Sequence, residues 1–460
     1  MAYHIEGSAK VLLKSGVFLN PSQVFNRDLT MLVSSIYSQS ITSPTLCILE
    51  PLAATGLRSI RYFKELPKPV SELFANDIDP EAVQQIRSNF ALNQVEGTVW
   101  QKDAIDAMHT YRSHWDIVDL DPYGSVASFL DSAVLSIKPG GLLCVTSTDM
   151  ITLCGNNPDT CFYKYQSLPS KAKYCHEFAL RILLYQLSAT ANKYQLCIEP
   201  LISLSVDFYV RVFVKVVSSA AQAKLSLSQS ALVLQCSSCP NFEVQPLGRD
   251  NSKRWSNNYW TAPGVCPHCN SSFIIQGPIY SGPLFNKPFV SQVLELAKEK
   301  KELKTREKIK GVLNSVTGEI DSLLGWNIGN LCKFFKVPAI SQKIFRSAVK
   351  SLGKEVSQSH SSPLIYKTSA SGAQVFEIFK HWKETNGVPL TKGVQEGGPA
   401  FRILSKGFGD EKPNFDMELT EGEKIELGKK RFHVNEPNWG PKSRPKKDKA
   451  EGEGVEGVNE

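Results

Sequence analysis

The stretch of sequence that decides the fold is WDIVDLDPYG, residues 115–124. Its first half is mostly apolar and predicts a buried strand, and the proline and glycine that follow predict a turn. Such a strand carries Asp121, Pro122 and Tyr123 to the edge of a sheet. Ligands of open α/β sheets bind at the carboxyl ends of strands, so this stretch is also the first candidate for a functional site.

Similar apolar runs lie on both sides of this stretch and alternate with amphipathic segments. Strand–helix alternation with nearly continuous apolar strands predicts a parallel sheet covered by helices on both faces. The expected strands are Leu46–Glu50, Glu72–Asn76, Asp116–Asp121 and Gly141–Ser147, and the expected helices are Leu57–Glu65, Pro80–Leu92 and Val126–Ile137.

A long helix and two β-rich runs complete this domain. The helix is expected over Lys171–Ala191, and the runs Gln195–Val206 and Phe208–Val217 follow it. So short a connection between the two runs permits only a hairpin, which adds an antiparallel pair at the sheet edge. The predicted fold class is therefore α/β, with the Rossmann-like layout of a class I, S-adenosylmethionine-dependent methyltransferase.

The length and composition predict a multidomain globular protein. A chain of 460 residues is too long for one ordinary core. We expect a first domain at residues 1–220, a smaller α+β domain at 221–406 and a largely disordered basic tail at 407–460. No apolar run reaches the roughly 18 residues that span a bilayer, and Met1–Lys14 lacks the pattern of a secretory signal or transit peptide. A monomer with reduced thiols is expected, and the net charge of +7 suits an anionic partner without requiring one.

Polar residues follow successive expected strands, where a nucleotide-binding sheet would need them. The small residues at 51–56 permit a sharp turn into a helix with free N–H groups. Asp77 ends the next strand, where a carboxylate can bind both hydroxyls of a ribose. Asp103 and Ala104 follow the third strand, where a carboxylate can accept a hydrogen bond from an adenine amino group. Each acid alone is more often a helix cap, but the set in register indicates a nucleoside-containing cofactor.

Asp121, Pro122 and Tyr123 form the acid–proline–aromatic pattern of amino-methyltransferases. An exocyclic amine is a poor nucleophile because its lone pair is delocalised into the ring. A carboxylate that accepts hydrogen bonds from its N–H groups aims that lone pair at a methyl donor. We therefore assign Asp121 as acceptor and Tyr123 to stacking on the target base. The alternative is that Asp119 and Asp121 cap the next helix while Tyr123 packs in the core.

Two pairs of cysteines in the second domain have the spacing of metal ligands. Each pair has the form CxxC, and two such knuckles supply four thiolates in the tetrahedral geometry of a structural zinc site. The ligands are Cys236, Cys239, Cys266 and Cys269. We expect His268, inside the second knuckle, to point outward. The other seven cysteines of the eleven show no such spacing.

The second domain also contains a candidate helix–turn–helix. Asn327–Phe335 and Ile340–Leu352 read as two helices, with Lys343, Arg346 and Lys350 along one side of the second. The β-like run Glu355–His360 permits a winged helix, and an ordinary packed helix pair is the alternative. In the tail, basic segments at 429–431 and 442–449 suit contacts with RNA phosphates, a nuclear import signal or a solubilising role.

Read together, these residues resemble the family of tRNA guanine-26 N2-dimethyltransferases. The resemblance covers most of the chain. The matching segments are Glu6–Lys10, Phe25–Thr30, Ala53–Arg61, Asn76–Ile78, Asp119–Ser125, Thr148-Asp149, Leu153–Gly155, Cys175–Glu177, Asp207–Arg211, Pro399–Leu404 and Asn438–Lys442.

The resemblance implies transfer of methyl groups from S-adenosylmethionine to the N2 of guanine 26 of tRNA, in the nucleus, the cytoplasm or a mitochondrial pool. It gives cofactor contacts to Arg27, Arg58, Asp77, Asp103 and Ala104, and the catalytic role to Asp121. Phe18 matches an aromatic residue placed against the substrate. The residues alone would make Arg27 a surface charge and Arg58 a solvated helix residue. The same chemistry on another guanine or RNA, or a non-catalytic RNA-binding protein, are the alternatives.

Overall fold

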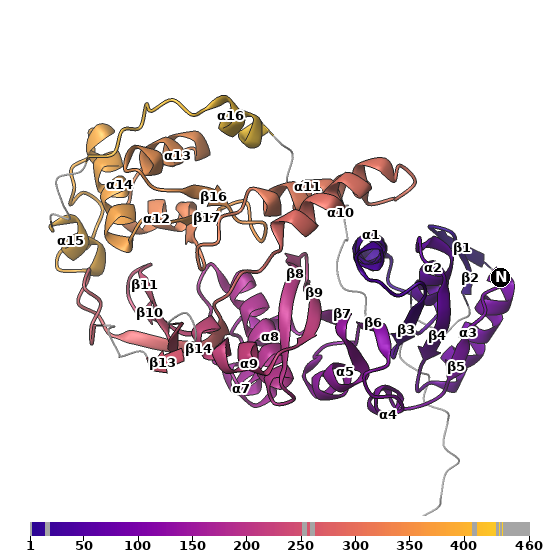
Figure 1. The fold of residues 1–460 in the computed structure, drawn as a ribbon. Coiled ribbons are helices and arrows are strands. Elements are labelled where there is room, and N and C mark those ends of the chain that lie inside the picture. The colour runs from indigo at the N-terminus through magenta and orange to yellow at the C-terminus, as the bar shows by residue number, and fades with distance from the viewer. Residues whose placement is uncertain are drawn as a thin grey trace, which may run out of the picture.

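The computed structural model shows a sheet domain in the first half of the chain and a second body built from its second half (Figure 1). It describes residues 2–13, 19–250, 255–257, 263–406, 412–428, 432 and 435. The sheet domain is built on seven strands in the order β5-β4-β3-β6-β7-β9-β8. Their bounds are β3 Leu46–Glu50, β4 Val70–Asn76, β5 Thr98–Trp100, β6 Trp115–Leu120, β7 Ile137–Ser147, β8 Leu196–Val206 and β9 Tyr209–Ser218.

The pairing of these strands confirms the predicted α/β class. β5, β4, β3, β6 and β7 run parallel, and β9 pairs antiparallel with both β7 and β8. In the view of Figure 1, helices α1 (Val24–Ser40) and α2 (Leu57–Glu65) lie above the sheet, whereas α4 (Ala104–His109) and α5 (Leu130–Ser136) lie below it. The two further large helices of this domain are α3 (Pro80–Asn93) and α8 (Cys175–Asn192).

One predicted helix is shorter than expected. The segment Val126–Ile137 was expected to be helical throughout, but it contains a 3-10 turn at Ala127–Phe129 and then α5. Ile137 is already extended and begins β7, and Pro139 cannot continue a helix because it has no N–H to donate. The long helix α8 likewise begins at Cys175 and not at Lys171.

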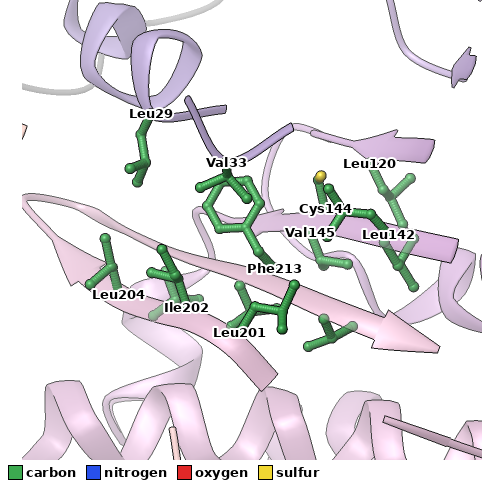
Figure 2. Close-up of a cluster of buried hydrophobic side chains, with 14 of the residues drawn as sticks. Leu29, Val33, Leu120, Leu142, Cys144, Val145, Leu201, Ile202, Leu204 and Phe213 are labelled. Atoms are coloured by element: carbon green, nitrogen blue, oxygen red, sulfur yellow. The ribbon is translucent and has the colours of Figure 1, made fainter. Parts of the chain in front are cut away.

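The strands of the parallel sheet are apolar along their length because both faces are covered. Figure 2 shows part of this core, where Val33 of α1 lies beside Phe213 of β9, and Leu120 of β6 lies beside Cys144 of β7. All four side chains are buried. The same core includes side chains from α10 (Lys287–Glu299) and α11 (Arg306–Thr317), far along the chain.

The smaller elements of the N-terminal part complete the sheet domain. They are the hairpin β1 (Ala2–Glu6) and β2 (Ala9–Leu13), the 3-10 turn Pro21–Gln23, α6 (Met150–Leu153), α7 (Pro158–Tyr165) and α9 (Ala220–Leu225). Among the described residues, no helix is long and apolar enough to cross a membrane.

The second body begins with a small antiparallel sheet, and the four predicted metal ligands lie at the end of one of its strands and in the segments between strands. The sheet has the order β11-β10-β14, formed by Phe242–Pro246, Ser230–Cys236 and Phe273–Tyr280. A two-stranded pair, β12 (Gly248–Asp250) and β13 (Trp255–Asn257), follows β11 in the chain. A separate buried cluster joins the cysteines to the last helices, including α14 (Gly372–Thr385) and α15 (Pro399–Leu404). The short helix α16 spans Glu421–Gly428.

The candidate helix–turn–helix has the strands of a wing. α12 (Ile328–Phe335) and α13 (Gln342–Ser351) are preceded by β15 (Trp326–Asn327) and followed by the hairpin β16 (Val356–Gln358) and β17 (Ile365–Thr368). The three strands form one sheet in the order β15-β17-β16. This arrangement corresponds to a winged helix and not to an isolated helix pair.

Lys343, Arg346 and Lys350 do not form the exposed basic side that was expected on α13. Arg346 is buried, and its guanidinium lies over the Tyr366 ring at 5.9 Å from the centroid. Lys350 is ion-paired with Glu423, which leaves Lys343 as the exposed member of the three. The expectation failed because spacing along a helix does not show which side faces the core.

A buried ionic network joins the two bodies. Lys367 of β17 lies 3.3 Å from a carboxylate oxygen of Glu177 in α8 and 3.0 Å from one of Glu319. Glu319 also accepts hydrogen bonds from the backbone N–H of His360 and pairs with its ring Nδ1 at 2.9 Å. The ring Nε2 of His360 in turn accepts from the N–H of Ser205 in β8. The network therefore fixes the second body against α8 and β8.

Lys367→Ala should lower the free energy of unfolding by about 3 to 5 kcal/mol, because it leaves the carboxylates of Glu177 and Glu319 buried without their shared partner. The matched control is Lys193→Ala, whose pair with Asp131 is more than half exposed. That control should cost at most about 1 kcal/mol. Urea denaturation of both variants measures the difference, and equal costs would contradict the buried role of Lys367.

Candidate active site and metal centre

Asp119, the fifth residue of β6, is the centre of a buried ion cluster. Its side chain is fully buried and accepts hydrogen bonds from two arginines: Arg58 of α2 at 2.6 Å and Arg211 of β9 at 3.0 and 2.9 Å. The hydroxyl of Tyr62 donates a fourth, at 2.7 Å. Burial alone would raise the pKa of Asp119, but the charges of Arg211 and Arg58 outweigh it and hold the pKa well below its ordinary range. The carboxylate is therefore ionised and fixed.

Asp121 lies at the outer limit of the same cluster. Its carboxylate is ion-paired with the second terminal nitrogen of Arg58, and about a fifth of its side chain is exposed. Arg58 thus bridges the buried Asp119 and the partly exposed Asp121. Neither aspartate caps the following helix, which excludes that alternative for both. The exposed part of Asp121 is available to a ligand, because Arg58 holds the other side.

The turn after Asp121 is held by the neighbouring strand. The N–H of Gly124 donates to the hydroxyl of Thr148 at 2.8 Å, and its carbonyl accepts from the N–H of Thr148 at 3.0 Å. Gly124 has φ of +78°, a conformation that residues with a Cβ rarely adopt. Beside it, Pro122 is buried, whereas Tyr123 is 57% exposed. The ring of Tyr123 therefore does not pack in the core and lies on the surface beside Asp121.

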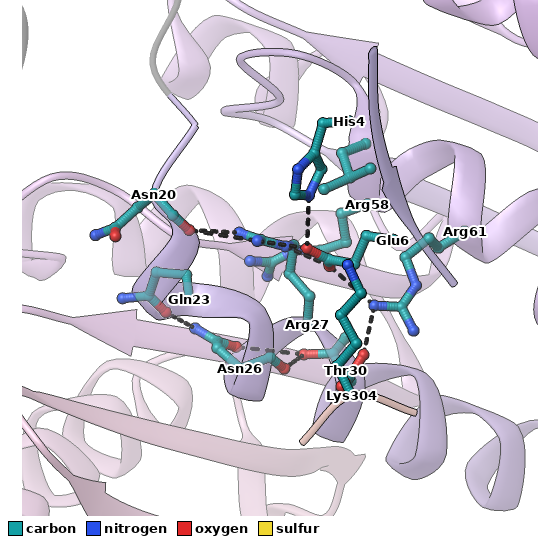
Figure 3. Close-up of polar contacts among 12 residues, drawn as sticks. His4, Glu6, Asn20, Gln23, Asn26, Arg27, Thr30, Arg58, Arg61 and Lys304 are labelled. Carbon is teal, nitrogen blue, oxygen red and sulfur yellow. Dashed lines mark hydrogen bonds and ion pairs between the residues drawn. The ribbon is translucent and has the colours of Figure 1, made fainter. Parts of the chain in front are cut away.

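The two arginines that the resemblance selected are buried, and so the surface positions predicted from the residues alone are wrong. The Arg58 side chain is 5% exposed, and Arg27 is bound by Glu6 of β1 through two hydrogen bonds of 2.7 Å. Figure 3 shows Glu6 between Arg27 and Arg61, with the carbonyl of Asn20 also facing Arg27. Burial would raise the pKa of Glu6, but Arg27 and Arg61 outweigh it and lower the pKa to about 2.

The expected cofactor residues lie at the carboxyl ends of successive strands. After β3, the turn passes through Ala54 (φ +49°) and Gly56 (φ +72°), and the N–H of Ala54 donates to Asp77 at 2.9 Å. Asp77 follows β4 and accepts a second hydrogen bond from the N–H of Asp79. Asp103 follows β5 and caps α4 through the N–H of Ile105.

This edge of the sheet fits a nucleoside-containing cofactor. The Asp103 side chain is exposed and Ala104 beside it is buried, so an aromatic base would have both a polar and an apolar contact. Asp77 is oriented by two backbone donors and is half-buried. Phe18, the remaining predicted substrate contact, lies outside the described residues.

The four predicted metal ligands come together as a buried cluster. The Sγ atoms of Cys236, Cys239, Cys266 and Cys269 all lie within 4.8 Å of one another, with Sγ–Sγ distances of 3.4 Å for the first and last and 3.7 Å for the middle two. The backbone N–H groups of Ser238 and Cys239 point at the sulfur of Cys236. Four buried thiols in this arrangement fit a structural zinc ion.

His268 does not point into solvent as expected. It is 7% exposed, and its ring packs edge-on against Phe376 of α14 at 5.0 Å between centroids. Nearby, Arg402 of α15 donates to the carbonyl of Cys269 at 3.0 Å. The second knuckle is therefore covered by the last helices, and His268 contributes to that packing.

Several residues that build the site carried no assigned role in the sequence. Arg211 lies 92 positions after Asp119, and no local spacing connects them. Thr148 and Tyr165 support the catalytic turn: the Tyr165 hydroxyl lies 2.8 Å from that of Ser125. Arg211 and Thr148 fall within segments of the family resemblance, which was the one available signal. Pairing across strands is not visible in a single sequence.

Glu50, at the end of β3, has an unusual protonation state. Its carboxylate accepts from the N–H of Ser59, and burial raises its pKa to about 7 even though Arg58 lies 3.7 Å away. Two arginines and two aspartates already balance their charges in this cluster, so a neutral Glu50 completes it without a net charge.

Glu50→Gln should flatten the pH dependence of stability. The pKa of Glu50 in the folded state, about 7, lies above the ordinary value of 4.5. Protonated Glu50 therefore contributes its full stabilisation below pH 4.5, and this stabilisation is lost as the pH rises through about 7. Between pH 5 and pH 8 the wild type should lose up to about 3 kcal/mol relative to the variant. Urea unfolding at both pH values measures this, and parallel pH profiles would contradict the assignment.

Comparison with known proteins finds one family model and several relatives that match most of the chain. The family model described as N2,N2-dimethylguanosine tRNA methyltransferase matches residues 2–380. The tRNA (guanine(26)-N(2))-dimethyltransferase of Drosophila melanogaster is 36% identical and aligns over 95% of this chain and 86% of its own length. The mitochondrial tRNA (guanine(26)-N(2))-dimethyltransferase of Saccharomyces cerevisiae is 34% identical over 96% of this chain and 91% of its own.

A solved structure shares both the fold and part of the sequence. Trm1 from Pyrococcus horikoshii, solved in complex with S-adenosyl-L-methionine, superposes with a TM-score of 0.72 and 28% identity. The match covers 82% of this chain and 99% of that one. With a family match over most of its length and relatives above 30% identity, this chain belongs to the N2,N2-dimethylguanosine tRNA methyltransferase family.

Proposed function

We propose that the protein transfers methyl groups from S-adenosylmethionine to the exocyclic N2 of guanine 26 of tRNA, giving N2-methylguanosine and then N2,N2-dimethylguanosine. The observation that carries the proposal is the position of Asp121: a carboxylate held by Arg58 and partly exposed beside the exposed ring of Tyr123. Family membership and the names of the relatives supply the nucleotide.

In this proposal Asp121 accepts hydrogen bonds from the amino group of the guanine. When bound, S-adenosylmethionine supplies an electrophilic methyl group on a sulfonium centre. Asp121 draws the amine nitrogen toward tetrahedral geometry, directs its lone pair and takes up the proton that is released. Arg58 keeps the carboxylate in one orientation, so the acceptor does not need to reorganise during the reaction.

Tyr123 and the turn that carries it would position the base. Guanine 26 must leave the RNA stack to reach a pocket at the sheet edge, and an exposed aromatic ring offers a face on which it can stack. The two hydrogen bonds between Gly124 and Thr148 hold the turn that carries this ring next to Asp121. Phe18, outside the described residues, is proposed as a second aromatic contact.

The cofactor would bind along the ends of β3, β4 and β5. Asp77 is placed for the ribose hydroxyls and Asp103 with Ala104 for the adenine, with Arg58 beside the methyl donor. Arg27 is engaged with Glu6 and Asn20, so we propose that it shapes this side of the pocket with its ion pair in place. The same proposal divides the chain into a catalytic domain at 1–220 and a zinc-containing, tRNA-docking domain at 221–406.

A nuclear or cytoplasmic location with a mitochondrial pool belongs to this proposal, and the mitochondrial relative in yeast supports only the mitochondrial pool. The basic tail segments at 429–431 and 442–449, which suggested RNA contacts or nuclear import, lie outside the described residues. A monomer is likewise proposed.

Asp121→Asn should reduce methyl transfer to unmodified tRNA by on the order of 100-fold or more, since the amide cannot take up the proton. Nucleoside mass spectrometry of the tRNA product measures N2-methyl- and N2,N2-dimethylguanosine. Asp131→Asn, at a half-exposed aspartate of α5, is the matched control and should keep wild-type activity. A tRNA with adenine at position 26 separates this function from methylation of another guanine. The absence of dimethylguanosine with wild-type protein would refute the proposed function.

Tyr123→Ala should lower kcat/KM for tRNA by roughly 5- to 100-fold, the equivalent of one lost base stack of about 1–3 kcal/mol. Tyr123→Phe keeps the ring and should retain most activity. Steady-state kinetics with both variants, together with calorimetric binding of S-adenosylmethionine, test this. Equal losses in the two variants would show that the hydroxyl, and not the stacking face, matters.

A further inference from the structure

Outside the site already described, two half-buried cysteines and a histidine face one another. The Sγ of Cys154 lies 4.0 Å from Nδ1 of His176, and the Sγ of Cys175 completes a group whose ligand atoms all lie within 4.8 Å of one another. The two cysteines are 21 residues apart and do not form a CxxC pair, so their spacing in the sequence does not reveal the group.

Helix ends and a tight turn place these side chains. Cys154 follows the last residue of α6 and caps that helix, its N–H donating to the carbonyl of Met150, and Cys175 is the first residue of α8. Gly155 has φ of +92°, and a Cβ there would come within 2.9 Å of the backbone of Ser170. The turn after Cys154 therefore lies flush against the segment that leads into Cys175, and only glycine fits there.

The dimensions suit a soft metal ion. Zinc binds sulfur at about 2.3 Å and imidazole nitrogen at about 2.0 Å, so in a tetrahedral site the two donors lie roughly 3.6 Å apart. The 4.0 Å between Cys154 and His176 needs only a small closure. For comparison, neighbouring sulfurs in the four-cysteine group are 3.4 and 3.7 Å apart.

We propose that Cys154, Cys175 and His176 form a second metal site, specific for zinc-like soft divalent cations, with water in the fourth position. Each of the three side chains is part-exposed, so an ion can enter and a solvent ligand can complete the tetrahedron. A disulfide between the two cysteines would leave the imidazole without a function in the group.

Such an ion would connect α6 to α8. α6 begins two residues after Thr148, which holds the turn at Gly124. α8 carries Glu177, part of the network between the two bodies. The second metal ion would therefore hold α6, and with it Thr148 and the turn at Gly124, against α8. The zinc of the four-cysteine site has no part in this contact.

The test is metal stoichiometry of the full chain, kept under reducing conditions, equilibrated with Zn²⁺ and desalted. Elemental analysis should give two zinc ions per wild-type chain, and one for Cys154→Ala and for Cys175→Ala. His176→Ala should bind the second ion more weakly. Cys332→Ala removes a cysteine that belongs to no such group among the described residues, and it should keep two. One zinc ion in the wild type, or two in the Cys154 and Cys175 variants, would overturn the proposal.

A second measurement does not depend on whether the variants fold. Wild-type chain that contains one zinc ion is titrated with Co²⁺, whose thiolate complexes absorb in the near ultraviolet. One further equivalent with a thiolate-to-cobalt band is expected. Absence of that band, or peptide mapping that finds Cys154 joined to Cys175 in a chain holding a single metal ion, would show that this pair is not a metal site.

Discussion

Asp119 carries a charge at the centre of the sheet domain, and its hydrogen bonds, together with those of its partner Arg211, join five elements. Arg58 and Tyr62 reach it from α2, and Arg211 reaches it from β9. Arg211 also donates to Thr146 of β7 and Thr30 of α1, at 2.8 Å each. A buried carboxylate is costly unless it is paired and fully hydrogen-bonded, so these elements can assemble only in an arrangement that supplies all its donors.

The position of the catalytic turn follows from that constraint. Arg58 is fixed by Asp119, and its remaining terminal nitrogen holds Asp121, two residues further along the chain. The buried side of the Arg58–Asp121 ion pair is shielded from water, and its exposed side faces the edge of the sheet. Burial raises the pKa of Glu50 to about 7, so this carboxyl is protonated in a large share of molecules near neutral pH and then adds no further negative charge to the cluster. A rigid acceptor at a sheet edge is what transfer to a weakly nucleophilic amine requires.

The second body depends on a different kind of interaction. Its core is small, and the four cysteines lie within it beside Trp326 and Phe376. A small core buries little apolar surface. A metal ion bound by the four cysteines would supply part of the folding free energy that this burial does not provide. The network of Glu177, Lys367 and Glu319 then sets how this body meets the sheet domain. The winged helix packs into the same core. Arg346 of its second helix, α13, is buried there, although its spacing with Lys343 and Lys350 predicted an exposed basic side.

The sequence by itself determined the α/β class, the alternating strands and helices from Leu46 onward apart from their ends, the position of Asp121 at a strand terminus and the four-cysteine site. These features depend on apolar periodicity, on turn residues and on ligands that lie close together in the chain, all of which are local. Only the tertiary structure decided that Arg27 and Arg58 are buried, that Arg211 completes the cluster and that Cys154 meets Cys175 and His176. These contacts join residues from 21 to 92 positions apart, and the packing of separate elements brings them together.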